Sequence, residues 1–191
     1  MRQSLTERLN QILPTITHSD FLNGKGLGNE IAFHIFDYAP EYELKVRSHI
    51  DNLIQQLAKT SPDLKVIHIN LFDLILDYLK ERNYLDKVLQ TQQQKGDSAV
   101  QKILTTLLQA EKLLPLFKKT AMPEQHNLVL VSGVGSVYPL LRTHSLLNNL
   151  HSVMGKTPLI LFFPGNYDGQ SLKLFGTLHD DNYYRAFKLI P

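Results

Sequence analysis

The sequence predicts an α/β fold, in which a mostly parallel five-stranded sheet carries helices on both faces. Short apolar runs of strand-like length alternate with longer segments whose apolar residues recur at helical spacing. The expected strands occupy residues 31–36, 64–69, 127–132, 159–163 and 184–190. A chain of 191 residues, 43% hydrophobic and 20% charged, is long enough to bury a core as a single domain spanning residues 1–191.

Composition excludes several classes of protein. The absence of cysteine rules out disulfides, thiolate nucleophiles and cysteine metal sites, and it fits a cytoplasmic protein. A net charge of +2 gives no reason to expect general affinity for nucleic acid or anionic membrane. The N-terminal stretch is too polar for a signal peptide, and no apolar run approaches the roughly 20 residues of a membrane span.

The segment before the first strand is expected to be a helix followed by a loop. Apolar residues from Leu5 to Leu13 share one helical face, and Pro14 is expected to end the helix. Residues 23–30 contain three glycines and Lys25, but a phosphate-binding loop follows a strand, and its lysine precedes Ser or Thr. We therefore predict a flexible turn here.

The turn after the first strand reads FDYAPEYE, residues 36–43. It contains neither glycine nor lysine, and Asp37, Glu41 and Glu43 would repel a phosphate. The following helix carries an apolar stripe formed by Val46, Ile50, Leu53, Ile54 and Leu57. This strand–turn–helix unit therefore has the layout of a nucleotide-binding unit without its phosphate-binding groups.

Helices are expected between the second and third strands. Asn70 is a suitable N-cap for the first of them, and the polar stretch 90–97 is expected to be a turn. A long helix from Asp97 is expected to end or kink at Pro115. Residues 71–120, approximately, thus form a predicted helical insertion within the α/β domain.

The third strand leads into the sharpest turn, SGVGSVYP at 132–139. Gly133 and Gly135 match half of a dinucleotide-binding fingerprint, but Tyr138 stands where the third glycine belongs. ATPases of this topology hold magnesium through a carboxylate at the end of the third strand, and Ser132 occupies that place here. The layout resembles a degenerate P-loop NTPase domain of the AAA or RecA kind, without Walker motifs, and we expect the turn to serve packing.

Polar residues in the last third of the chain are weak candidates for chemistry. Asp168 and the run HDD at 179–181 fall in expected turns, where aspartate is common for conformational reasons. His144 and His151 are two helical turns apart, without a carboxylate or third histidine close by in the sequence. We therefore predict no catalytic residue, no metal site and no cofactor.

Three runs of residues together resemble a known family. GVGSVYPLLR at 133–142, PLILFFPGNYDGQSLKLFG at 158–176 and DNYYRAF at 181–187 resemble, in order and spacing, the BrxB family of bacterial BREX phage-exclusion systems. The resemblance implies a cytoplasmic component of a defence island that also encodes a methyltransferase, a large ATPase and the phosphatase-like protein PglZ. It implies no catalytic residues, and it implies a role in protein–protein interaction, with PglZ as the best candidate partner.

The leading hypothesis is therefore a non-enzymatic assembly subunit that uses the loops at the carboxyl edge of its sheet. Because Tyr and Arg are favoured at interface hot spots, the candidate partner contacts are Tyr138, Arg142, Tyr167, Asp168, Tyr183, Tyr184 and Arg185. Two alternatives stay open. One is a nucleotide-binding subunit with an unorthodox site at the turn from Ser132 to Ser136, and the other is a DNA-binding accessory module.

Overall fold

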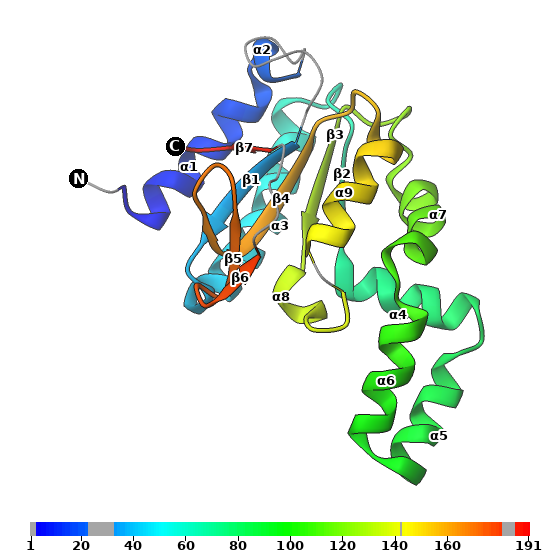
Figure 1. Ribbon diagram of the computed structural model, residues 1–191. Helices are drawn as coiled ribbons and strands as arrows, with labels where there is room; N and C mark the ends of the chain where they lie inside the picture. The colour runs from blue at the N-terminus through cyan, green and yellow to red at the C-terminus, as the bar shows by residue number, and fades with distance from the viewer. Residues whose placement is uncertain (1–2, 23–32, 142, 181–185) are drawn as a thin grey trace.

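The computed structural model describes residues 3–22, 33–141, 143–180 and 186–191. Five strands form a parallel sheet in the order β2-β3-β4-β1-β7 (Figure 1). Their bounds are β1 Phe33–Tyr38, β2 Val66–Asn70, β3 Leu128–Ser132, β4 Leu159–Tyr167 and β7 Phe187–Lys188. The predicted α/β class and mostly parallel sheet are confirmed.

The structure contains two further strands that the sequence pattern does not predict. Strands β5 (Leu172–Leu174) and β6 (Leu178–Asp180) continue from β4 as a short antiparallel meander. The last parallel strand is also shorter than the expected 184–190. Within the described residues only Phe187 and Lys188 pair with β1, opposite His34 and Ile35.

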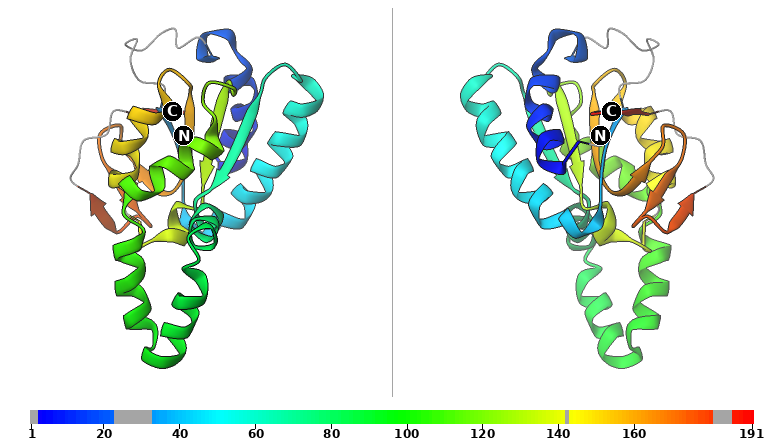
Figure 2. Two further views of the ribbon diagram at one scale, coloured as in Figure 1. Left: turned by 90° about the vertical axis from the view of Figure 1, so that its right-hand side faces the viewer. Right: turned by 90° about the vertical axis from the view of Figure 1, so that its left-hand side faces the viewer.

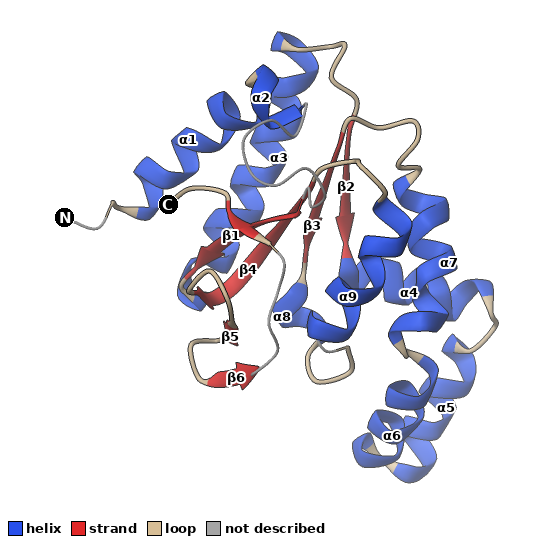
Figure 3. Ribbon diagram, turned by 45° about the horizontal axis from the view of Figure 1, so that its top comes forward, coloured by secondary structure: helices blue, strands red, loops and turns tan. Residues whose placement is uncertain are grey.

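Helices cover both faces of the sheet (Figures 1 and 3). Helices α1 (Leu5–Thr17) and α3 (Glu43–Thr60) pack on one face, against Phe36, Leu130 and Phe162. Helices α4 (Leu71–Glu81), α7 (Ala110–Ala121), α8 (Val134–Val137) and α9 (Thr143–Met154) pack on the other, against Ile35, Val131 and Leu161. Alternate residues of each strand therefore enter different cores, which is why the strands read as continuous apolar runs. The short elements α2 (Ser19–Leu22) and η1 (Pro40–Tyr42) complete the connections.

Neither helix ends at the proline where an end was predicted. Helix α1 continues through Pro14 to Thr17, and α7 continues through Pro115 to Ala121. In both helices apolar residues on either side of the proline are buried, as with Leu113 and Phe117 around Pro115, so packing outweighs the one lost backbone hydrogen bond. The chain breaks instead at Leu108, whose side chain is 1% exposed.

Four helices lie between β2 and β3, where the sequence predicts the helical insertion. Helices α5 (Leu85–Lys95) and α6 (Asp97–Leu107) form an antiparallel pair that projects from the body of the molecule beyond the carboxyl ends of the strands (Figures 1 and 2). We call this pair the arm. The polar stretch expected as a turn is helical as far as Lys95, and the chain reverses only at Gly96, whose φ is 74°.

A buried ionic junction fastens the N-terminal helix to the sheet. Asp37, at the end of β1, is 5% exposed and accepts hydrogen bonds from Arg8 at 2.6 Å and from the backbone amide of Tyr167 at 3.0 Å. The ammonium of Lys188 lies 3.4 Å from the same carboxylate. Asp37 thus has a structural role in joining α1, β1, β4 and β7. None of the helices in the described ranges is both long and apolar enough to cross a membrane.

Candidate functional site at the carboxyl edge of the sheet

The turn from β3 to α8 has the shape of a phosphate-binding turn, but protein atoms fill it. Gly133 has φ 81°, and a Cβ there would lie 2.6 Å from Oδ1 of Asn70. That oxygen accepts the amide of Phe72 at 2.9 Å and so caps α4. Gly133 is therefore required for the close approach of this turn to the start of α4, as the packing interpretation of the sequence expects.

The second glycine of the turn also serves packing. A Cβ on Gly135 would lie 2.9 Å from the ring of Phe175 and 3.1 Å from Pro164. Phe175 in turn meets the ring of Tyr138 edge-on, with centroids 6.1 Å apart. The space beside the glycines is thus occupied by the meander after β4. Pro139 follows α8 through a cis bond rather than opening a helix, and α9 begins only at Thr143.

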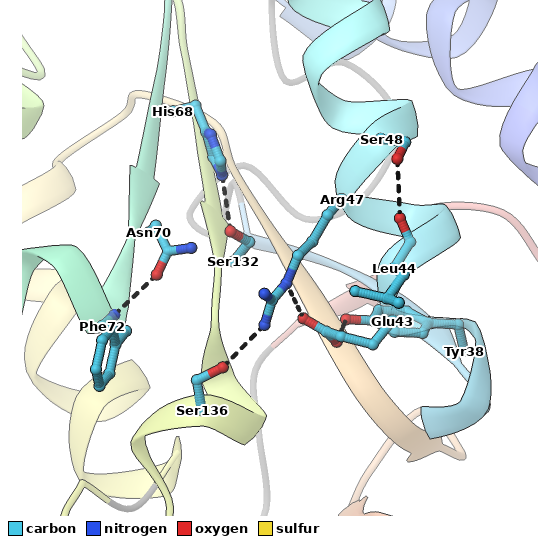
Figure 4. A network of polar contacts seen from close by, with 10 residues as sticks. All are labelled: Tyr38, Glu43, Leu44, Arg47, Ser48, His68, Asn70, Phe72, Ser132 and Ser136. Atoms are coloured by element: carbon cyan, nitrogen blue, oxygen red, sulfur yellow. Dashed lines mark hydrogen bonds and ion pairs between the residues drawn. The ribbon is translucent and has the colours of Figure 1, made fainter.

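A polar network links the ends of β1 and β3 through α3 (Figure 4). The guanidinium of Arg47 donates to Glu43 at 2.8 Å and to the hydroxyl of Ser136 at 3.0 Å. Glu43 also accepts the hydroxyl of Tyr38 at 2.5 Å. Burial, reinforced by the neighbouring Glu43 carboxylate, raises the pKa of Tyr38, so this hydroxyl stays protonated as a donor. Arg47, which contacts Ser136 of the turn, is therefore already paired with Glu43.

Ser132 forms a hydrogen bond with His68 of the neighbouring strand. The Ser132 hydroxyl is 3% exposed and lies 2.7 Å from Nε2 of His68 (Figure 4). Burial lowers the pKa of the His68 imidazole, an effect that nearby Asp51 and Asp73 oppose. A serine and a histidine in contact have the first element of a nucleophilic pair. Within the described residues, however, no third group is hydrogen-bonded to the other ring nitrogen to orient it.

A cleft of about 410 Å³ opens beside this pair, between α3 and α4. The charged residues that line the cleft are three aspartates, Asp51, Asp73 and Asp77, and one arginine, Arg47. Because Glu43 already pairs with Arg47, the cleft presents net negative charge. A triphosphate would be repelled from it, whereas a phosphate loop surrounds its ligand with amides and a lysine.

Of the seven predicted partner contacts, three lie within the described residues and differ in their exposure, and four lie outside them. Tyr138 is exposed at the carboxyl edge, at 40%. Tyr167 is fully buried, and its hydroxyl donates to the carbonyl of Ala186 at 2.6 Å. This burial corrects the prediction that Tyr167 contacts a partner. Arg142 and the three residues Tyr183, Tyr184 and Arg185 lie outside the described residues.

Asp168 is exposed and closes a turn. Its carboxylate accepts the amides of Ser171 and Gln170 at 2.7 and 2.9 Å and the hydroxyl of Ser171 at 2.8 Å. These hydrogen bonds, that of the Ser171 amide foremost, lower the pKa of Asp168 to about 2. Its oxygens are thus committed to the local turn, which is the ordinary use of aspartate at such a position.

The carboxyl edge exposes apolar side chains that the sequence reading did not select. Six of them follow the ends of the first four strands: Tyr42 and Leu44 after β1, Phe72 after β2, Tyr138 after β3, and Phe175 and Leu178 after β4. We call this set the edge surface. The position of two of these residues relative to the buried stripe of each helix could have identified them. Leu44 and Phe72 stand in the first turns of α3 and α4 but lie off the buried stripes of those helices.

Comparison with known proteins places the chain in a family. The family model described as BREX protein BrxB matches residues 67–189. The chain is 43% identical over 190 residues to a BREX protein BrxB of Bacillus cereus (strain H3081.97), covering 97% of each chain. The chain belongs to the BrxB family. A BREX protein BrxB of Escherichia coli O9:H4 (strain HS) is 38% identical over 187 residues, covering 98% of this chain and 92% of that protein.

The BrxB match confirms the resemblance and makes this chain a component of a BREX phage-exclusion system. The matched region runs from β2 to β7, so it includes the arm and three of the four strand ends that carry the edge surface, whereas the α3 wall of the cleft, with Arg47 and Asp51, lies before it. No solved structure matches the chain significantly. The BrxB name identifies the system but no chemical activity.

Proposed function

We propose that this BrxB protein is a non-enzymatic, cytoplasmic assembly subunit of its BREX system, and that it binds the phosphatase-like PglZ through the edge surface. The observation that carries the proposal is the position of the exposed apolar residues. Large apolar side chains such as Phe72 and Tyr138 emerge after four different strands, yet all at the same edge of the sheet. Aromatic residues presented on a rigid scaffold are typical anchors of protein interfaces.

The turns that would carry nucleotide chemistry support the same proposal. The turn at Gly133 and Gly135 is packed against Asn70 and Phe175, and the neighbouring cleft is acidic. The fold is accordingly interpreted as a P-loop-like scaffold whose carboxyl edge has become a contact surface. The likeness to a P-loop scaffold rests on topology, and the fold is called degenerate because the phosphate-binding groups are missing. A likeness of fold does not imply an activity.

Co-expression tests the proposal directly. The chain is produced together with PglZ from the same defence island, and the mixture is separated by size-exclusion chromatography. The proposal predicts co-elution as one complex that persists in about 0.5 M salt, because apolar contacts are not screened. Separate elution of the two proteins at micromolar concentration would overturn the choice of PglZ.

The nucleotide-binding alternative has one geometric observation in its favour, although the negative charge of the cleft opposes it. The Ser132–His68 contact at 2.7 Å lies beside a cleft of suitable size for a small molecule. A nucleotide-binding subunit predicts a rise in melting temperature with ATP or GTP and magnesium at millimolar concentration. If the melting temperature rises with nucleotide and does not rise for the Ser132→Ala variant, the nucleotide-binding alternative replaces the assembly proposal.

A further inference from the structure

The arm has an apolar face that the described chain covers only in part, since Leu104 and Leu107 are half-buried and Ile103 is exposed. Helix α6 has no buried residue, although Val100, Ile103, Leu104 and Leu107 form a continuous stripe along it. In α5 only Val88 is buried. Two helices of 11 residues each are at the lower limit of length for stability in water, so their stability depends on packing of this face.

The partly covered face is hollowed into a groove between the two helices. The groove has a volume of about 420 Å³. Its apolar lining comes from Tyr84 and Val88 on the α5 side and from Ile103 and Leu107 of α6. A groove between two antiparallel helices accepts a third helix, whose apolar residues at i, i+3 or i+4 and i+7 enter it as anchors.

The charge around the groove determines the chemistry of that third helix. Among the described residues that line the groove, Lys87 alone carries a charge. The stretch from Arg82 to Leu107, which contains both arm helices, has four Lys or Arg and two Asp, a net charge of +2, so it accounts for the whole formal charge of the chain. Acidic residues flanking the apolar stripe of a partner helix would complement this charge. A second copy of this chain is disfavoured, because pairing two arms would bring like charges together.

We propose that the arm groove binds an amphipathic helix of a partner protein whose apolar stripe is flanked by Glu or Asp. Protein is favoured over nucleic acid because the groove is apolar and has a single cation. Phosphate contacts would leave Ile103 and Leu107 without a matching surface. The arm and the edge surface share no residue, so this binding is independent of the proposed contact with PglZ.

The probe is a fluorescein-labelled synthetic amphipathic helix of about five turns, with a leucine stripe flanked by glutamates, measured by fluorescence anisotropy with the full chain. The glutamate peptide is expected to bind at least about tenfold more tightly than a lysine-flanked version at low salt, and salt should narrow the difference. Ile103→Glu is expected to weaken binding about tenfold. Lys87→Glu should reduce the preference for the acidic peptide.

Leu89→Glu is the matched control. Leu89 is an exposed leucine of α5, at 49%, that does not line the groove, so the same change there should leave the dissociation constant unchanged. The proposal is overturned if a scrambled acidic peptide binds equally well, if Leu89→Glu weakens binding as much as Ile103→Glu, or if no peptide binds saturably up to about 100 μM. Retardation of duplex DNA that Lys87→Glu abolishes and Ile103→Glu leaves unchanged would assign the arm to nucleic acid instead.

Discussion

The guanidinium of Arg8 lies 2.6 Å from the carboxylate of Asp37, across 29 residues of sequence. Side-chain exposures are 18% for Arg8 and 7% for Asp37, so the pair is largely shielded from water. A second guanidinium nitrogen of Arg8 donates to the carbonyl of Asp37 at 2.8 Å. Arg8 therefore binds both the side chain and the backbone of Asp37, and these charge-assisted hydrogen bonds connect α1 to the sheet.

Arg8→Met should destabilise the protein by about 3 kcal/mol, because it leaves the buried Asp37 carboxylate with fewer partners. The free energy of unfolding from urea titration measures the loss. Arg47→Met is the control, since the Arg47–Glu43 pair is more exposed, at 43% and 24%, and exposed pairs contribute less than about 1 kcal/mol. Equal losses in the two variants would show that the Arg8 pair is not a buried connection.

Gly133→Ala should destabilise the protein by about 3 kcal/mol. Part of the loss is the positive φ of 81°, which costs an alanine about 1–2 kcal/mol. The rest is the collision of the new Cβ with Asn70. Gly155→Ala separates these contributions, because Gly155 also has positive φ, 56°, but nothing lies within 4 Å of its added Cβ. If the two alanine variants lose the same stability, the close approach to α4 contributes nothing.

Acid should destabilise the protein through His34. Burial lowers the pKa of His34 from 6.5 to about 4, and its ring lies 4.6 Å from that of Phe21. The unfolded chain binds the proton more readily, so stability is complete above about pH 6.5 and is lost as pH falls toward 4. By pH 4.5 this single histidine should account for about 2 kcal/mol of the loss.

Comparison of unfolding free energies at pH 7 and pH 4.5 checks this prediction. His34→Gln should retain more of its pH 7 stability at pH 4.5 than the parent chain does. His18→Gln changes a histidine that is 65% exposed and should follow the parent. Parallel curves for all three proteins would mean that His34 does not stay neutral in the folded chain.

The parts of the fold that depend on local pattern could be predicted from the sequence, and those that depend on tertiary packing could not. The apolar runs gave the class of the sheet, and Asn70 caps α4 as predicted. The helices that continue through Pro14 and Pro115 could not be predicted, because the burial that stabilises them depends on tertiary packing. The polar stretch before Gly96 has the composition of a turn, because residues 90–95 include no apolar side chain that would mark a helical face.

The candidate site shows the same limit. The lack of phosphate-binding groups could be predicted from the sequence, because it depends only on which residue types stand in the turns. Exposure was not visible: Tyr167 was selected as a contact although it is buried, and Phe72 and Phe175 were overlooked although they are exposed. The residue type of an aromatic side chain does not reveal whether it packs in the core or is exposed to a partner.

Phe72→Ala should weaken the binding of PglZ about tenfold or more, because an aromatic anchor at the centre of an interface typically contributes over 1 kcal/mol. Phe72 is 46% exposed, so its removal should change the free energy of unfolding by less than about 0.5 kcal/mol. Calorimetric titration of purified PglZ with the variant gives the dissociation constant, and urea unfolding confirms that the fold is intact.

Leu89→Ala serves as the control for that titration, because Leu89 has similar exposure, 49%, but lies on the arm away from the edge surface. The edge surface predicts an unchanged dissociation constant for Leu89→Ala and a weakened one for both Phe72→Ala and Phe175→Ala. If PglZ binds all three variants as tightly as the parent chain, the edge surface is not its docking site. If only Leu89→Ala loses affinity, the arm carries the contact instead.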